Sequence, residues 1–328
     1  MIEPVRIGIT MGDPAGVGAE IIAKTICRGR IKKIGKVLVI GDRWVFNKIK
    51  NKGLRIKNDQ FMDLNNVPRK NFRFGKVKRE FGQAAIEYLR AAVELIKIRR
   101  IDCLVTAPIS KEAINLAGYK YNGHTEFLAR TFGKGKQDLV MMLLNKYLKI
   151  SLVTRHLALS KVSPTLTQQA IFNTIMITQK ALGEYFSINN PSICVTALNP
   201  HAGDGGILGN EETKIILPAV QRARRLIKDV IGPLPADTAF SAAKQGRFSA
   251  VIAMYHDQAL IPLKTLDSRS GVNLTIGLGF VRTSPLHGTG FDIAGKNVAS
   301  NASLIAAINT AVKCSVNLRK ASLNKIKR

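Results

Sequence analysis

The chain has 328 residues, of which 46% are hydrophobic and 22% are charged. This composition is typical of a globular protein with a sizeable core and excludes a disordered chain; the length suggests two domains or one large α/β unit. The chain has 50 Lys and Arg against 22 Asp and Glu, a net charge of +28. A charge of this size makes nucleic acid a candidate partner. The basic residues are diffuse, however, and their densest stretch, residues 43–79, lacks the aromatic signature of an RNA-binding module. This distribution argues against nucleic acid as the partner.

No apolar run approaches the ~20 residues that a transmembrane helix needs. The N-terminal MIEPVRIGIT predicts a first strand rather than a signal peptide. The four cysteines, Cys27, Cys103, Cys194 and Cys314, are widely spaced and form no C-x-x-C motif. This pattern favours buried, reduced thiols over a disulfide framework, and we expect a cytoplasmic protein.

Short β-branched runs alternate along the chain with longer helical patterns. Strands are predicted at residues 5–10, 36–41, 103–107, 149–154, 192–198 and 250–255, and helices at residues 19–26, 83–100, 167–185, 211–230 and 299–318. The alternation predicts an α/β fold with parallel sheets covered on both faces. In such sheets, binding sites form beyond the carboxyl ends of the strands. The residues that follow each run are therefore the candidate functional residues.

Three of the five histidines directly follow predicted strands: His156, His201 and His256. A lone histidine in such a place is usually structural. Three at equivalent positions on one sheet edge can converge, and three neutral imidazoles with an open position suit a catalytic Zn²⁺-like ion. There is no H-x-H or H-E-x-x-H motif to decide the matter. From the pattern alone, a tri-histidine metal site and three structural histidines both remain open.

Two loops carry features that suit anions. GDPAGVG at residues 12–18 links the first strand to a helix, but it is neither G-x-G-x-x-G nor a Walker motif, so it fits a tight turn as well as a binding loop. His124 and Thr125 precede an apolar helical start. There, Thr125 is predicted to be an N-cap, and both side chains suit contact with a phosphate or a carboxylate.

Further polar side chains stand near the other predicted strand ends. Lys264, Asn273 and Arg282 form a spaced set of donors suited to anion binding. Lys111 and Asp257 are candidates for proton transfer. Asp257 has an alternative role, the orientation of a metal-bound histidine through a hydrogen bond.

Taken together, seven segments resemble the 4-hydroxythreonine-4-phosphate dehydrogenase family of vitamin B6 biosynthesis. They are GITMGDPAGVGAEI (8–21), TAPISKEAINLAG (106–118), GHTEFLA (123–129), LNPHAGDGGILGNEE (198–212), GPLPADTAF (232–240), YHDQALIPLK (255–264) and VNLTIGLGFVRTSPLHGTGFDIAGK (272–296). They occur in family order over nearly the whole chain. At position 286 this chain has Leu, where the family frequently has Asp. The missing carboxylate beside His287 affects how far the details of cofactor binding carry over from the family.

The resemblance implies a fold similar to isocitrate and isopropylmalate dehydrogenases, with two α/β/α subdomains and a cleft between them. We expect the first subdomain at residues 1–129 plus 305–328. The second is expected at residues 130–304, carrying the metal-ligand histidines and the dimer contacts. The resemblance further implies a homodimer with its active site at the subunit interface and metal ligands from both subunits.

By the same resemblance, the metal ligands are His156, His201 and His256, and the substrate contacts are His124, Thr125, Lys264, Asn273 and Arg282. The implied cofactors are NAD or NADP and one divalent metal ion per site, with zinc expected first and magnesium, cobalt or manganese as alternatives. The residues that bind the nicotinamide cofactor are not identified.

The implied reaction is NAD(P)-dependent oxidation of 4-phosphooxy-L-threonine to 2-amino-3-oxo-4-phosphooxybutanoate, which decarboxylates to 3-amino-2-oxopropyl phosphate. The metal ion would act as a Lewis acid on the substrate hydroxyl, and the nicotinamide would accept the hydride. One alternative is a dehydrogenase of a related four-carbon acid phosphate, such as threonate or erythronate 4-phosphate. The alternative of another class is a nucleic-acid-binding protein, on the basis of the net charge.

Overall fold

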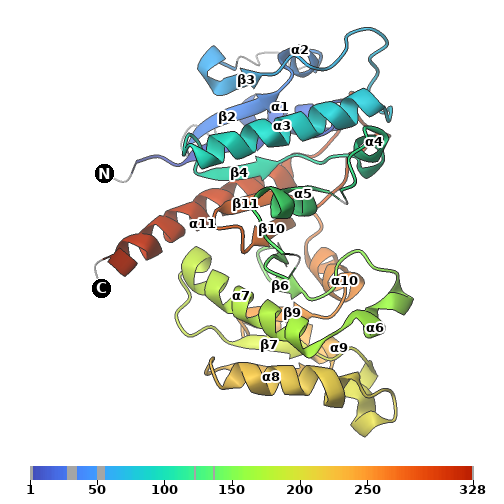
Figure 1. Cartoon of the computed structure of the whole chain (residues 1–328), viewed down its shortest axis with the longest axis vertical. Helices are drawn as coiled ribbons and strands as arrows, with labels where there is room; N and C mark the ends of the chain where they lie inside the picture. Colours follow the sequence, from blue (N-terminus) through green and yellow to red (C-terminus); the bar gives the residue numbers. More distant parts are fainter. Residues whose placement is uncertain (1–2, 28–34, 50–55, 122, 136, 327–328) are drawn as a thin grey trace. The chain divides into compact units, whose positions relative to one another are not determined.

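The computed structural model describes residues 3–27, 35–49, 56–121, 123–135 and 137–326 (Figure 1). The chain divides into two compact units. Unit 1 comprises Met1–Gly133 and Phe280–Val316, and unit 2 comprises Lys134–Gly279 and Asn317–Arg328. The sequence-based division placed residues 280–304 in the second subdomain, whereas here they pack with unit 1. The reason is that the strand at Val281–Pro285 pairs with a strand of that unit.

Unit 1 is built on a parallel sheet with the strand order β3-β2-β1-β4-β11. Its central strands are buried on both faces, as their continuous apolar sequences predict. The long helix α3 packs on β2, β1 and β4 (Figure 1). The elements of unit 1 are β1 (Arg6–Thr10), α1 (Gly18–Cys27), β2 (Lys36–Gly41), α2 (Arg43–Asn47), η2 (Asn58–Gln60), β3 (Phe61–Asp63), α3 (Arg79–Lys97), β4 (Cys103–Thr106), α4 (Lys111–Leu116), α5 (His124–Thr131), β11 (Val281–Pro285) and the start of α11 (Ala302–Ile326).

Unit 2 has a mixed sheet with the strand order β10-β5-β6-β9-β7-β8. The β6, β9, β7 and β8 strands are parallel, whereas β5 is antiparallel to both β6 and β10. The elements of unit 2 are β5 (Val140–Leu144), β6 (Lys149–Leu152), η3 (Leu159–Lys161), α6 (Val162–Thr165), α7 (Gln168–Phe186), β7 (Ile193–Thr196), η4 (Pro200–Gly206), η5 (Glu212–Ile216), α8 (Leu217–Arg224), β8 (Val230–Leu234), α9 (Ala236–Lys244), β9 (Ala250–Ala253), α10 (His256–Leu266) and β10 (Val272–Ile276).

The sheet of unit 2 is covered on both faces. On one face, α7 and α8 bury an apolar cluster that includes Ile175, Val195, Val220 and Ile252. The α9 helix packs on β7 and β9, and α10 packs on β5, β6 and β9. Because β6, β9 and β7 are parallel neighbours in the sheet, their carboxyl ends lie next to one another along one edge.

The predicted α/β class is confirmed, and each predicted strand and helix corresponds to an element of the structure. The expectation of purely parallel sheets is wrong for β5 and β10. A tight turn joins β5 to β6: Asn145 Oδ1 accepts hydrogen bonds from the backbone N–H groups of Tyr147 (2.8 Å) and Leu148 (2.9 Å). A turn this short can only reverse the chain, so the strands it joins run antiparallel. None of the described helices is both long enough and apolar enough to cross a bilayer.

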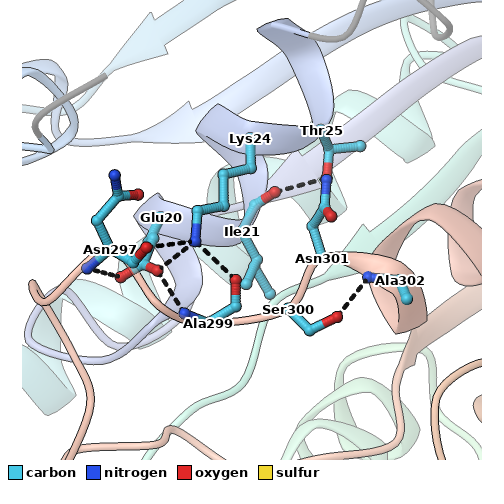
Figure 2. Close-up of polar contacts among 9 residues, drawn as sticks. All are labelled: Glu20, Ile21, Lys24, Thr25, Asn297, Ala299, Ser300, Asn301 and Ala302. Atoms are coloured by element: carbon cyan, nitrogen blue, oxygen red, sulfur yellow. Dashed lines mark hydrogen bonds and ion pairs between the residues drawn. The ribbon is translucent and has the colours of Figure 1, made fainter. Parts of the chain in front are cut away.

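In unit 1, a buried ion pair attaches the segment before α11 to α1 (Figure 2). Glu20, with 1% of its side chain exposed, lies 2.9 Å from the Lys24 Nζ. The Glu20 carboxylate accepts hydrogen bonds from the backbone N–H groups of Asn297 (3.2 Å) and Ala299 (2.7 Å). The Lys24 ammonium donates to the carbonyl groups of the same two residues. The two side chains of this ion pair thus bind both the backbone N–H groups and the carbonyl groups of Asn297 and Ala299.

Candidate active site

The three histidines singled out from the sequence follow three neighbouring parallel strands of unit 2. His156 lies shortly after β6, His256 is the first residue of α10 after β9, and His201 lies in η4 after β7. The carboxyl ends of parallel strands meet at one edge of a sheet. All three imidazoles therefore belong to the same edge, as the sequence pattern predicts.

Side-chain hydrogen bonds join these strand ends to one another. Thr154 Oγ1 donates to the carbonyl of Met254 (2.7 Å), which connects the end of β6 to the end of β9. Gln258, which is buried, accepts from Met254 N (2.7 Å) and Thr196 Oγ1 (2.9 Å) and donates to the carbonyl of Ala197 (2.7 Å). Gln258 thus connects β9 to β7. Sequence reasoning missed this residue, because a glutamine in the first turn of a helix carries no distinctive signal.

His156 and His256 lie side by side. Their ring centroids are 5.5 Å apart with an interplanar angle of 47°. Two imidazoles that each place a nitrogen about 2 Å from one tetrahedral ion have centroids roughly 5 Å apart, so this pair fits a shared cation. The Asp257 carboxylate lies 2.6 Å from Nδ1 of His256, which leaves Nε2 of that ring as the ligand atom. This contact favours the orienting role of Asp257 over proton transfer.

His201 occupies an unusual loop. From His201 to Gly205 every residue has a positive φ, between 43° and 83°. His156 also has a positive φ, of 49°. Each non-glycine residue in this region costs about 1–2 kcal/mol, and such conformations cluster at functional sites. Among the described residues of this single chain, no group of three or more His, Cys, Asp or Glu side chains is arranged to hold a metal ion.

A second group of candidate residues lies on the sheet of unit 1. Thr10 and Thr106 are partners in the β1–β4 register, and Arg282 is the partner of Leu104, so their side chains project from one face of the sheet. Arg282 is 1% exposed, and its Nη2 donates to Thr106 Oγ1 (2.6 Å). Burial lowers the pKa of the Arg282 guanidinium. A guanidinium nevertheless stays charged at neutral pH and suits an anionic ligand.

His124 is neutral in this environment. Burial lowers the pKa of its imidazole well below the usual value, and the nearby Arg282 cation lowers it further. The ring donates to the carbonyl of Ala107. Its Nε2 has no hydrogen-bond partner among the described residues, so the donating nitrogen is Nδ1. Nε2 is therefore a hydrogen-bond acceptor, suited to a ligand hydroxyl or ammonium group rather than to a fully ionised phosphate.

The other predicted residues are more dispersed. Thr125 is not an N-cap, because α5 begins at His124 and Gly123 is its N-cap. Lys111 is exposed at the first position of α4 in unit 1, and Lys264 is exposed near the end of α10 in unit 2. Asn273 lies in β10 of unit 2, where its Oδ1 is buried and has no hydrogen-bond partner among the described residues.

Asp13, in the glycine-rich loop at residues 12–18, is a buried acid that the sequence does not single out. It is fully buried, its Oδ1 accepts from Ala15 N (2.9 Å), and its Oδ2 has no hydrogen-bond partner among the described residues. Burial raises the pKa of Asp13 to about 7, although the bond from Ala15 opposes the shift. Only the structure shows that this carboxyl is buried, because the glycines around it suggest an exposed turn.

The chain forms two α/β units. One has imidazoles at adjacent strand ends, and the other has a buried arginine beside a neutral histidine. This combination is typical of an α/β enzyme. Residues 22–311 match the PdxA family, described as pyridoxal phosphate biosynthetic protein PdxA. The chain belongs to this family, and this membership confirms the predicted oxidoreductase class.

Relatives cover nearly the whole chain. A 4-hydroxythreonine-4-phosphate dehydrogenase from Geobacter metallireducens is 42% identical over 92% of this chain and 93% of its own length. A D-threonate 4-phosphate dehydrogenase from Cupriavidus necator is 40% identical over 92% and 95%. The crystal structure of a 4-hydroxythreonine-4-phosphate dehydrogenase from Klebsiella pneumoniae is 36% identical, covers 96% of this chain and 98% of its own, and has a TM-score of 0.84.

Proposed function

We propose that this protein oxidises 4-phosphooxy-L-threonine with NAD or NADP in pyridoxal 5′-phosphate biosynthesis. The product, 2-amino-3-oxo-4-phosphooxybutanoate, is a β-keto acid that loses CO₂ to give 3-amino-2-oxopropyl phosphate. The observation that carries the proposal is the match to PdxA over residues 22–311, together with nearly full-length relatives that bear the name of this activity.

His156, His201 and His256 would hold one divalent ion, with zinc the first candidate because neutral imidazoles suit it. The closeness of the His156 and His256 rings supports this assignment. When bound, the ion supplies Lewis-acid polarisation of the substrate hydroxyl. Asp257 orients His256 and raises the basicity of its free nitrogen through the 2.6 Å contact with Nδ1.

The remaining residues are proposed to bind and orient the substrate. Arg282, Lys264 and Asn273 would hold its anionic groups, because two are cations and the third offers an amide donor. His124 would accept a hydrogen bond at Nε2 from a hydroxyl or ammonium group. Thr125 follows it in the first turn of α5. Lys111 remains the candidate for proton transfer. The nicotinamide supplies the hydride acceptor.

A homodimer is the proposed functional form, and exposed apolar side chains near the histidines support it. Leu157 and Leu159 follow His156, and Ile207 and Leu208 follow His201; the exposed fractions are 37%, 71%, 82% and 45%. Such side chains next to functional loops are typical of an interface. We also propose a cytoplasmic location, in keeping with the buried thiols of Cys103, Cys194 and Cys314.

D-threonate 4-phosphate is a second candidate substrate, because several relatives bear its name. Relatives named for that substrate are 37–40% identical to this chain, about as similar as those named for 4-hydroxythreonine 4-phosphate. The two substrates differ in the group next to the carboxylate, an amine in one and a hydroxyl in the other. Either group donates a hydrogen bond to a neutral imidazole, so His124 alone does not choose between them.

The deciding test is NAD(P)H formation by the purified full chain with each substrate, with and without added Zn²⁺, Co²⁺ or Mg²⁺. We expect metal-dependent turnover, with kcat/KM higher for 4-phosphooxy-L-threonine than for D-threonate 4-phosphate. The His201→Ala variant should lose turnover by orders of magnitude while remaining folded. A reversed preference would favour the second substrate, and equal turnover by metal-free wild type or by His201→Ala would contradict the metal site.

A further inference from the structure

We propose that Glu212 is a positioning residue for His201: its buried carboxylate holds the loop that carries this histidine in the conformation that binds the metal ion. The inference rests on the proposed function, because it assumes that His201 is a metal ligand. It concerns a residue that neither touches the ion nor contributes a donor to it.

The Glu212 carboxylate binds the backbone that leads into the loop. Glu212 is 3% exposed, and its Oε1 accepts hydrogen bonds from Leu198 N (2.8 Å) and Asn199 N (2.8 Å). Its Oε2 accepts from Asn199 Nδ2 (2.9 Å). These two backbone amides are the last before Pro200, which has no N–H of its own. One side chain therefore fixes the direction in which the chain leaves β7 for His201.

The same carboxylate lies against the left-handed turn itself. A Cβ atom at Gly203 would lie 2.7 Å from Glu212 Oε2, and Gly203 has a φ of +83°. The turn also holds His201, Ala202 and Asp204 at φ values of 51°, 56° and 43°. Non-glycine residues avoid this region unless the surroundings impose it. Glu212 is thus a buried group that lies against the turn and also binds the chain before it.

A second carboxylate extends the attachment toward His156. Glu211 Oε2 accepts from Asn199 Nδ2 (2.8 Å), and Glu211 Oε1 accepts from Ser163 Oγ (2.5 Å). Ser163 lies in α6, on the segment that follows His156. These hydrogen bonds lower the pKa of Glu211. Asn199 is thus held by both carboxylates. Glu211 joins Asn199, which lies just before His201, to Ser163, which lies on the segment after His156.

Loss of the Glu212 contacts should let the loop relax toward ordinary backbone conformations, so that His201 no longer points where the ion needs it. Residues that orient metal ligands typically contribute roughly 10- to 100-fold to metal affinity. We therefore expect Glu212 to act on metal binding more than on folding.

The test is Co²⁺ binding to the purified full chain, measured by competition with a chromophoric chelator and by the visible absorption of bound Co²⁺. The variants are Glu212→Gln and Gly203→Ala, with His201→Ala as the reference for loss of a ligand. Gly205→Ala is the matched control, because Gly205 also has a positive φ, of +64°, but an added Cβ atom there would meet no neighbouring atom within 4 Å.

We expect Glu212→Gln and Gly203→Ala to weaken Co²⁺ binding at least 10-fold and to shift the absorption toward that of His201→Ala. Gly205→Ala should remain within about 3-fold of wild type. Wild-type affinity and spectrum in both Glu212→Gln and Gly203→Ala, with loss in His201→Ala, would overturn the inference and leave the proposed function intact. If wild type binds no Co²⁺, or His201→Ala binds it as well as wild type, the metal site and this inference both fail.

Thermal melting of the metal-free proteins separates folding from positioning. We expect a small decrease in Tm for Glu212→Gln, and a Co²⁺ spectrum that stays altered even at saturating metal. If the Tm falls but the saturated spectrum matches wild type, Glu212 has only a structural role and the inference is wrong. Gly203→Ala keeps the test valid should Glu212→Gln fail to fold, because it disturbs the same contact without removing the carboxylate.

Discussion

Asp13 is the residue at which burial has the clearest consequence for stability. Its carboxyl is fully buried, and burial raises its pKa from 3.8 to about 7. Between these two values the folded chain holds a proton that the unfolded chain releases. Protonated Asp13 therefore contributes its full stability to the folded state below about pH 4. This contribution to the free energy of unfolding is lost as the pH rises through about 7. A shift of this size corresponds to something on the order of 4 kcal/mol at most.

The Asp13→Asn variant should remove this pH dependence. The amide keeps an oxygen for the hydrogen bond from Ala15 and cannot ionise, so its stability relative to wild type should rise from pH 4 to pH 7 and level off above pH 8. Guanidinium unfolding at several pH values measures the effect, with the exposed Asp59→Asn as the control. A constant difference between Asp13→Asn and wild type over this range would show that Asp13 does not titrate in the window that we expect.

At the scale of elements, the Glu20–Lys24 pair decides whether the segment before α11 stays attached to α1 (Figure 2). Replacing Lys24 by Met leaves the buried Glu20 carboxylate without its cation, and removal of one partner of a buried pair costs about 3–5 kcal/mol. We expect a loss in the lower part of that range, because 22% of the Lys24 side chain is exposed. Chemical unfolding gives the free energy, and hydrogen exchange at Asn297 and Ala299 should become faster.

An exposed ion pair provides the comparison. Lys97 and Glu94 lie 2.8 Å apart on α3, with 47% and 65% of their side chains exposed. Lys97→Met should change the unfolding free energy by less than about 1 kcal/mol, because water screens such pairs. Equal effects of Lys24→Met and Lys97→Met would mean that burial of Glu20 does not strengthen its dependence on the lysine.

The sequence predicts elements that have a regular pattern of apolar residues. Central strands such as β1 and β4 are continuous apolar runs because both of their faces are buried. β11 was missed because it carries Arg282, a cation that no hydrophobic pattern would place in a core. α10 was missed because Pro262 lies inside it and masks the helical pattern.

The candidate site divides in the same way. The three histidines could be found because each follows a recognisable strand. Gln258 and Glu212 could not, because a polar residue near the start of a helix usually faces solvent. Their importance depends on which backbone groups lie opposite them, and only the three-dimensional path of the chain determines that.

At the scale of the whole molecule, the proposed homodimer predicts a role for two exposed side chains that lie near the proposed ligands in the sequence. Leu159 is 71% exposed and Ile207 is 82% exposed. Burial of such a side chain contributes about 1.5–3 kcal/mol, whereas burial of an unpaired carboxylate is strongly unfavourable. In a two-fold symmetric interface each substitution acts twice. Ile207→Asp and Leu159→Asp should therefore convert the dimer to monomers.

Sedimentation at low micromolar concentration measures this change, and Ile98→Asp is the control because Ile98 is 65% exposed in unit 1, away from the histidine-bearing segments in sequence. We expect Ile98→Asp to remain dimeric and to bind Co²⁺ like wild type. If the ligands of one ion come from both subunits, the monomeric variants should also lose Co²⁺ although all three histidines are intact. A stable monomer with undiminished Co²⁺ affinity would place the complete metal site within one chain, whereas a dimer unaffected by both aspartates would place the interface elsewhere.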